Sequence, residues 1–273
     1  MHYREIKPQL ELQTFVECFW TLTSEAGDPY VAQESILPDG CVELILNSGA
    51  PFREIQESGK QVRQPDLFVV GQMTRPVLIA PTGYVDLIGI RFHPGGTVPF
   101  FEQPLHELTN RIVEVGGLAS ALEKELRDTL TSSAASAERI NAIERCLTRR
   151  AQAFAGDQRL SELIANAVRV SGRITIERLA DSAGISARQL ERRFLGEVGL
   201  GPKLFCRILR FQQVFRAVAE HSAGWADLAI DCGYYDQAHL IRDFQQFAHQ
   251  TPAVLLSQSS GLTEAFTRKH RSI

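Results

Sequence analysis

The last third of the chain repeats one pattern of residues, and this repeat limits the possible folds more than any other feature. The segment ITIERLADSAG at 174–184 aligns with GWADLAIDCGY, which begins at position 224. The offset is 49 at the matched Leu-Ala pairs and glycines, and 50 at three later pairs: Leu190 and Leu240, Phe194 and Phe244, Pro202 and Pro252. An internal duplication predicts two copies of one supersecondary unit.

Each copy has the residues that two helices and a tight turn require. Gly184 and Gly233 stand where a left-handed residue would end the first helix. Ser186 can cap the second helix of the first copy, and Gln189 three residues later completes a capping box. Asp236 can cap the matching helix of the second copy. We therefore expect two helix-turn-helix units.

The apolar spacing predicts how these helices pack. Leu190 and Phe194 are four residues apart, as are Leu240 and Phe244, so each pair anchors one helix face and leaves the opposite face free. A long helix over about 203–220 is predicted by one apolar stripe with 4-3-4-3 spacing: Leu204, Ile208, Phe211, Phe215 and Val218. If this long helix holds the two helices that have a free face about 34 Å apart, they can enter successive major grooves on one face of DNA.

This layout, with the segments GPKLFCRILRFQQV and GYYDQAHLIRDFQQFAHQTP, resembles the AraC/XylS family of bacterial transcription regulators over residues of about 157–257. One departure is His249, at a predicted helix end where the family pattern usually has glycine. The N-terminal part resembles the β-rich sensor half of a subgroup, in LPDGCVELIL at 37–46, VVGQMTRP at 69–76 and IGIRFHPGG at 88–96. The resemblance implies an N-terminal domain that binds an effector or dimerises.

The expected fold class is α+β with two domains. Up to about residue 93, short apolar runs alternate with turn residues, which predicts a β-rich barrel or sandwich. The runs lie at 18–23, 41–47, 67–72, 77–80 and 85–92. From about residue 104 the pattern becomes helical. The expected divisions are a β-rich sensing domain at 1–115, a helical linker at 116–156 and an all-α double helix-turn-helix domain at 157–273.

The linker leaves two alternatives open. Leu118, Leu122 and Leu126 form one stripe on a predicted helix. The stripe either forms a homodimer interface or packs on the chain's own β-domain, and the spacing is consistent with both.

Composition narrows the function classes. Residues 1–156 carry 14 Lys+Arg and 20 Asp+Glu, whereas residues 157–273 carry 15 and 12, so only the second part is basic. The five cysteines are scattered, which indicates reduced core thiols rather than a zinc site or disulfides. The chain has neither an apolar run of the roughly 18 residues that a membrane span needs nor a signal-peptide core, so we expect a cytoplasmic protein.

Base-reading residues should be polar and lie on the free face of each recognition helix. The candidates are Arg188, Glu191 and Arg192 in the first copy, and Gln237, His239 and Arg242 in the second, with Ile241 available to touch a thymine methyl. Arg can bond guanine at two atoms, Gln can do so with adenine, and Glu can accept from cytosine. The alternatives are a solvated charged face, or readers one position away at Gln189 or Arg193.

Four residues near helix ends are candidate phosphate contacts, or else plain caps and surface charges: Ser171, Thr175, Lys203 and Arg207. Glu43 and Arg91 are charges inside apolar runs. They could line an effector pocket, but an ion pair between them, or an outward position on a strand, is favoured.

The sequence predicts a sequence-specific DNA-binding regulator. Its expected partners are double-stranded DNA and a small-molecule effector, with RNA polymerase and a second copy of the chain as further candidates. We predict no cofactor and no metal site. An enzyme on the β-domain would need a convergent acid–base set, which the sequence does not show. A DNA-repair hybrid with a methyl-accepting cysteine would need a metal-bound cysteine cluster.

Overall fold

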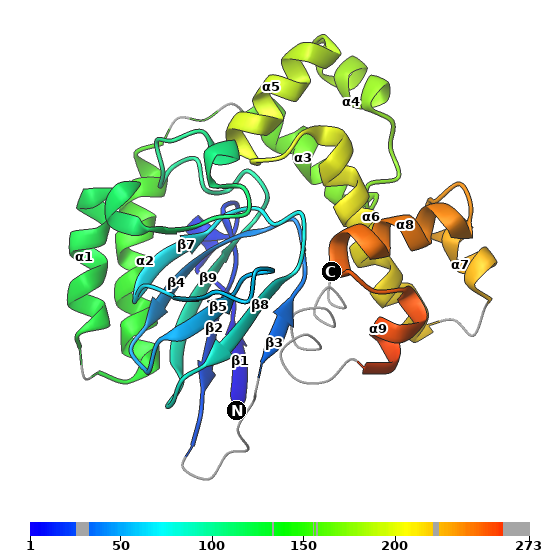
Figure 1. Cartoon of the computed structure of the whole chain (residues 1–273). Helices are drawn as coiled ribbons and strands as arrows, with labels where there is room; N and C mark the ends of the chain where they lie inside the picture. Colours follow the sequence, from blue (N-terminus) through cyan, green and yellow to red (C-terminus); the bar gives the residue numbers. More distant parts are fainter. Residues whose placement is uncertain (26–32, 133, 155, 157, 221–223, 259–273) are drawn as a thin grey trace.

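The computed structural model describes residues 1–25, 33–132, 134–154, 156, 158–220 and 224–258. A β-rich N-terminal part is followed by a C-terminal part whose described elements are all helices (Figure 1). The strands are β1 (His2–Ile6), β2 (Val16–Thr23), β3 (Glu34–Ile36), β4 (Val42–Asn47), β5 (Phe52–Ile55), β6 (Gln61–Arg63), β7 (Leu67–Val70), β8 (Val77–Pro81), β9 (Asp86–Phe92) and β10 (Ile112–Glu114). The helices are α1 (Ser120–Leu130), α2 (Ser136–Gln152), α3 (Gln158–Arg169), α4 (Ile176–Ala183), α5 (Ala187–Glu197), α6 (Pro202–Glu220), α7 (Trp225–Asp231), α8 (Gln237–Ala248) and α9 (Pro252–Gln258).

The strands form two antiparallel sheets rather than a closed barrel. The larger sheet has the order β1-β2-β9-β4-β7-β10, and the smaller has β3-β8-β5-β6. The five predicted strands are all present, as β2, β4, β7, β8 and β9. The sandwich alternative is therefore correct, and the barrel is not observed.

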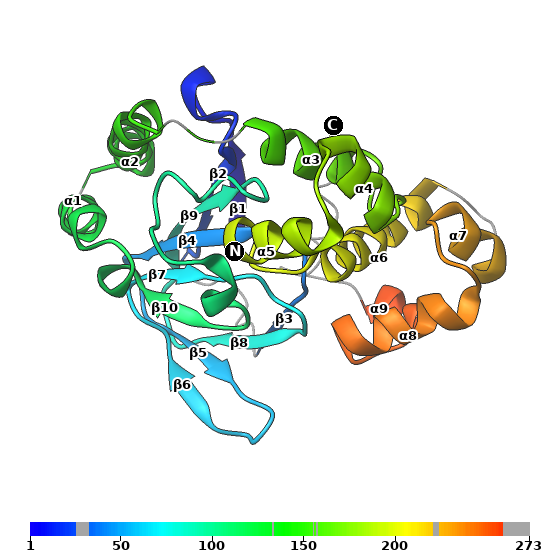
Figure 2. The ribbon, with the colours of Figure 1, turned by 90° about the horizontal axis from the view of Figure 1, so that it is seen from above.

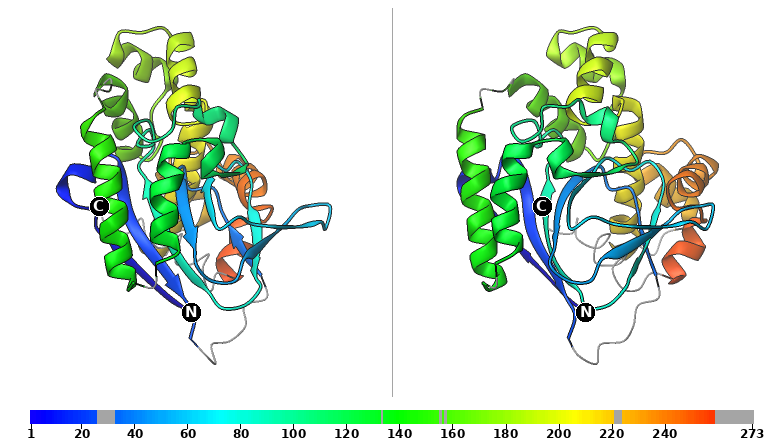
Figure 3. Two further views of the ribbon diagram at one scale, coloured as in Figure 1. Left: turned by 90° about the vertical axis from the view of Figure 1, so that its left-hand side faces the viewer. Right: turned by 60° about the vertical axis from the view of Figure 1, so that its left-hand side comes forward.

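The larger sheet separates two different environments. On β9, Ile88, Ile90 and Phe92 face the helices α1 and α2, which cover that side of the sheet (Figures 1 and 3). Leu87 and Arg91 alternate with them and face the cavity on the other side. This alternation follows from the two-residue period of a strand, and it explains how a charged residue can lie inside an apolar run.

The leucine stripe of the linker packs on the chain's own β-domain. Leu118, Leu122 and Leu126 are all buried in the cluster that includes Ile90 and Ile143. Of the two alternatives left open, packing on the β-domain is the one observed, and the stripe is not available as a dimer interface because its apolar surface is already covered within one chain. A homodimer formed by another surface stays a prediction.

The C-terminal core is built around the long helix α6. Its predicted apolar stripe is confirmed, with Ile208 and Phe211 fully buried. Figure 2 shows α6 running between the β-domain and the helices that follow it. Helices α4 and α5 lie near one end of α6, and α7 and α8 near the other (Figure 1).

Replacing Leu122 tests the packing of the leucine stripe. Leu122→Ala should lower the free energy of unfolding by about 2–5 kcal/mol, because it opens a cavity in a fully buried site. Chemical denaturation of the full chain measures this loss. The exposed Lys124→Ala on the same helix should stay within about 0.5 kcal/mol of wild type. Equal effects of the two substitutions would show that Leu122 is not a core residue.

Candidate DNA-binding surface and effector pocket

The first helix-turn-helix unit consists of α4, a tight turn and α5. Gly184 ends α4 in the left-handed conformation with φ of 64°, as predicted. Ser186 caps α5 by accepting from the Gln189 backbone N–H, and the Gln189 side chain accepts in return from the Ser186 N–H, which forms the predicted capping box. These two local signals fix where one helix ends and the next begins.

Helix α5 has one anchored face and one free face. Leu190 and Phe194 are fully buried, which confirms the anchor. Arg188, Glu191 and Arg192 are all exposed, as the reading of base edges requires. Their exposure places them on a free polar surface, and their contact with bases stays a prediction.

The second unit is built the same way from α7 and α8. Gly233 follows α7 with φ of 80°, and the Asp236 carboxylate accepts from the His239 backbone N–H at 2.7 Å to cap α8. The anchors Leu240 and Phe244 are fully buried. The predicted helix end at His249 is also correct, because this residue closes α8 with φ of 55°.

The candidate readers of α8 differ in exposure. Gln237 and Arg242 are exposed, whereas His239 and Ile241 are half-buried. The His239 ring lies edge-on to the Tyr234 ring at 5.3 Å, so part of its surface packs within the unit. Arg242 donates from Nε to the Ala238 carbonyl on its own helix and forms no ion pair with a described acidic residue. Its guanidinium is therefore available at the surface.

The neighbouring residue Asp243 forms an ion pair with Arg207 rather than with Arg242. Arg207 donates to the buried Asp243 carboxylate at 2.7 Å and lies over the Phe247 ring. It also bonds Gln246 Oε1 at 2.6 Å. These contacts make Arg207 a structural residue that holds α8 on α6, which favours the alternative to a phosphate contact.

The other three candidate phosphate contacts lie at helix ends or turns. Thr175 caps α4 by accepting from the Arg178 backbone N–H. Ser171 has φ of 50° and hydrogen bonds to Gln213 Oε1. Lys203 is exposed in the first turn of α6. Of these, Lys203 has the free charge that a phosphate contact needs.

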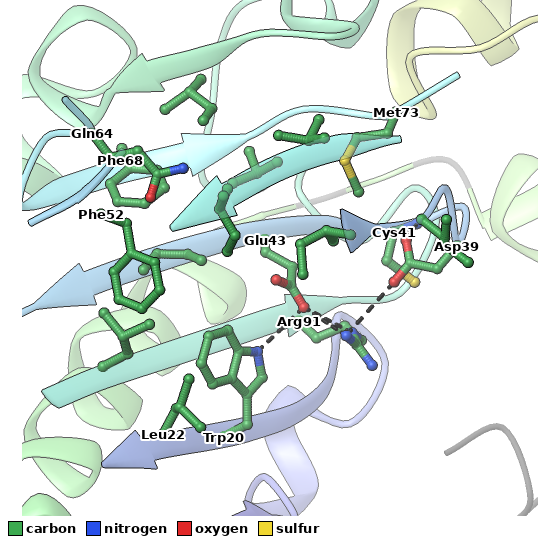
Figure 4. A pocket seen from close by; sticks show the side chains of 18 of the residues that line it. Trp20, Leu22, Asp39, Cys41, Glu43, Phe52, Gln64, Phe68, Met73 and Arg91 are labelled. Carbon is green, nitrogen blue, oxygen red and sulfur yellow. Dashed lines mark hydrogen bonds and ion pairs between the residues drawn. The ribbon is translucent and has the colours of Figure 1, made fainter. Parts of the chain in front are cut away.

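A second site lies in the β-domain, where a cavity of about 80 Å³ opens between the two sheets and α6 (Figure 4). Its apolar lining includes Trp20, Phe52, Phe68 and Met73. One water needs only ~10–15 Å³, so the cavity has space for a small organic group. At one end the lining becomes polar and charged.

Glu43 and Arg91 meet at this polar end. The register pairs them directly across β4 and β9, and Arg91 donates to Glu43 Oε1 from Nε at 2.9 Å and from a terminal nitrogen at 2.8 Å. Trp20 Nε1 donates to the same oxygen at 3.2 Å. Asp39 Oδ2 lies 3.6 Å from the Arg91 guanidinium. The favoured ion pair is confirmed, and the same two residues line the cavity.

Burial changes the pKa of the two carboxyl groups beside Arg91. Desolvation raises the pKa of both Asp39 and Glu43 above their usual range, and the charge of Arg91 offsets this only in part. Two carboxylates therefore share one guanidinium in an environment that disfavours a second negative charge.

The loop Pro38-Asp39-Gly40 connects this cavity to the helical domain. Gln212 on α6 donates from Nε2 to the Pro38 carbonyl at 2.6 Å, and Gln72 donates to the Gly40 carbonyl at 2.7 Å. Both glutamines are buried. Asp39 lies between these two anchored carbonyls, so the loop contacts the cavity and α6 at once.

Sequence reasoning missed Asp39, Gln72 and Gln212. Asp39 is in a Pro-Asp-Gly triplet, which predicts a turn and does not indicate that its side chain lines a cavity. Gln212 follows Phe211 in a stripe of apolar residues, and only a second packing surface on α6 explains why it is buried. All five cysteines are free and buried, as predicted, and burial raises the pKa of the Cys206 thiol to about 11.

Comparisons with known proteins match both parts of the chain. Residues 4–114 match a domain of unknown function (DUF6597), and residues 179–258 match a helix-turn-helix domain. Among solved structures, an apo variant of ToxT from Vibrio cholerae is 6% identical with a TM-score of 0.47, over 89% of this chain and 98% of that one. Wild-type ToxT bound to an unsaturated fatty acid is 8% identical, also with a TM-score of 0.47, over 89% and 96%. The AraC-like transcriptional activator CuxR is 14% identical with a TM-score of 0.29, over 80% and 86%. The comparison with curated proteins gave no match.

The two capped units, their free polar faces and the matched helix-turn-helix domain define a DNA-binding protein. More specifically, residues 179–258 form a helix-turn-helix domain, and a β-rich domain that matches a family of unknown function precedes it. None of the described helices is long and apolar enough to cross a membrane.

The pair formed by Arg207 and Asp243 gives a stability prediction. Arg207→Ala should lower the free energy of unfolding by about 3–5 kcal/mol, because it leaves the buried Asp243 carboxylate without its partner. Arg242→Ala, at an exposed arginine on α8, is the matched control and should change stability by less than about 0.5 kcal/mol. Thermal or chemical unfolding of both variants decides. If Arg207→Ala is as stable as the control, Arg207 is not the residue that holds α8 in place.

Proposed function

We propose that the chain binds specific DNA sites by inserting α5 and α8 into the major groove, and that a small molecule bound in the β-domain controls this binding. The observation that carries the proposal is the pair of exposed polar faces on two helices of matching design. Arg192 and Arg242 occupy equivalent positions in the two units, each two residues after a buried leucine. The same surface feature presented twice is what a DNA site with two half-sites requires.

Side-chain chemistry divides the proposed contacts into two kinds. Arg188, Glu191 and Arg192, together with Gln237 and Arg242, have donors and acceptors that can read base edges. His239 and Ile241 are half-buried, so they would contact DNA over a smaller area. Lys203 would bind the DNA backbone, because its ammonium group neutralises a phosphate without distinguishing one base from another.

The control element is the cavity beside the Pro38-Asp39-Gly40 loop. A small molecule there would lie against Gln212, which belongs to the helix that joins both DNA-binding units. Such a protein would act in the cytoplasm as a regulator rather than an enzyme. Contacts with RNA polymerase and a homodimer stay predictions.

Arg192→Ala tests sequence recognition. The variant should lose about 1–3 kcal/mol of binding free energy and relax the preference at one base pair, because a bidentate bond to guanine is removed. The measurement is binding of the full chain to a library of operator variants selected from random DNA. Arg53→Ala, an exposed arginine on β5, should leave the preference unchanged. If Arg192→Ala keeps the wild-type preference and stability, Arg192 is not a reader and Arg188 becomes the candidate.

Lys203→Ala should behave differently. Loss of a phosphate contact weakens binding to all sequences alike and reduces the slope of log K against log salt by about one. Titrations at several salt concentrations measure that slope. A change in base preference, or an unchanged slope, would contradict the assignment of Lys203 to the backbone.

A further inference from the structure

At the polar end of the cavity, two side-chain oxygens that can accept hydrogen bonds receive none from the described residues. Three donor atoms converge on Glu43 Oε1, namely Trp20 Nε1 and two nitrogens of Arg91. Glu43 Oε2 accepts no hydrogen bond from the described residues. In Figure 4 this second oxygen points away from Arg91 and toward the apolar lining.

Gln212 adds a neutral acceptor from the helical domain. Its side chain is 2% exposed, and its Nε2 is already used on the Pro38 carbonyl. Its Oε1 is buried and has no hydrogen-bond partner. A buried carbonyl oxygen without a donor costs free energy, about 1–3 kcal/mol, and a ligand that carries N–H groups would recover it.

The charges at the polar end of the cavity also favour a ligand with hydrogen-bond donors. Asp39 and Glu43 together carry two negative charges when ionised, and Arg91 supplies one positive charge. Asp39 Oδ1 accepts from the Cys41 backbone N–H at 2.9 Å, whereas Asp39 Oδ2 is 3.6 Å from the guanidinium, too long for a good hydrogen bond, so its charge is only partly compensated. Burial raises the pKa of both carboxyl groups, because the desolvated site disfavours their negative charges and Arg91 offsets this only in part.

The remainder of the cavity is apolar. Trp20, Leu22, Phe52, Phe68 and Ile45 form its walls, and Gln64 is the polar side chain of the far end (Figure 4). A ligand that suits this cavity has an apolar body and one cationic, donor-bearing head. A ligand carboxylate at the polar end would instead meet two carboxylates and an unpaired carbonyl oxygen, beside a single guanidinium that Glu43 already engages.

We propose that this cavity binds a lipophilic amine, with its ammonium head on Asp39, Glu43 and Gln212 Oε1 and its apolar body beside Trp20 and Phe68. This deepens the proposed function and rests on it only for the effect on DNA. Because one of the ligand's contacts is on α6, binding would strengthen the connection between the Pro38-Asp39-Gly40 loop and the helix that joins the two DNA-binding units.

Three probes of equal chain length test the ligand class: n-octylamine, octan-1-ol and octanoate. Isothermal calorimetry on the full chain without DNA measures each affinity. The amine should bind at least about tenfold more tightly than the alcohol, since its head gains charge-assisted bonds to the carboxylates. Octanoate should bind most weakly. Octanoate binding as tightly as the amine, or no measurable binding of the amine at millimolar concentration, overturns the proposal.

Glu43→Gln keeps the shape of the site and removes one charge. It should weaken the amine about tenfold and leave the alcohol nearly unchanged, whereas Asp128→Asn, an exposed carboxylate on α1, should affect neither. If Glu43→Gln alters folding, Gln212→Leu provides a second test, and it should also weaken the amine. Amine affinity that is equal in wild type and in both pocket variants overturns the proposal. Since no DNA is present, failure here leaves operator binding intact, and failure of operator binding leaves these affinities intact.

Discussion

Helix α6 is buried on more than one side, and the arrangement of the other parts depends on that. Phe205 packs on Phe194 of the first unit at 5.9 Å, and Phe211 packs on Phe244 and Phe247 of the second at 4.8 and 5.4 Å. These aromatic contacts attach both helices, α5 and α8, to one rod formed by α6. The same helix turns Gln212 toward the β-domain, where it holds the Pro38 carbonyl. The separation of the two exposed helix faces and their connection to the pocket therefore have one structural origin.

The β-domain joins this rod through a small number of polar contacts. Besides the bond from Gln212, Thr109 donates to the Gly199 carbonyl at 2.7 Å, at the turn between α5 and α6. Leu37 enters the helical core from the loop that carries Asp39. An event in the cavity can thus reach the helical domain through a few residues, because the loop is shared by both. If the cavity binds the proposed small molecule and α5 and α8 bind DNA, differential contacts, rather than distance, would carry the coupling between the two sites.

The sequence predicted the helical half well because its signals are local. A capping box, a left-handed glycine and a four-residue spacing each act within one turn of helix, so Ser186, Gly184 and Leu190 could be assigned without knowing the fold. The β-domain was harder. The pairing of Glu43 with Arg91 depends on a register between distant strands, and the burial of Leu122 depends on which surface covers it. Gln212 could not be recognised, since only the contact between domains explains a buried amide in an apolar stripe.

The most direct test of the central claim is the spacing of the two half-sites in DNA selected by the full chain. If α6 fixes α5 and α8 in one relation, inserting 5 base pairs between the half-sites turns one of them to the opposite face of the duplex, about half a helical turn away. Affinity measured by titration should then fall at least about tenfold, while it should fall much less when the same bases are added outside the site. Affinity that is unchanged by the internal insertion would contradict a rigid connection between the two units.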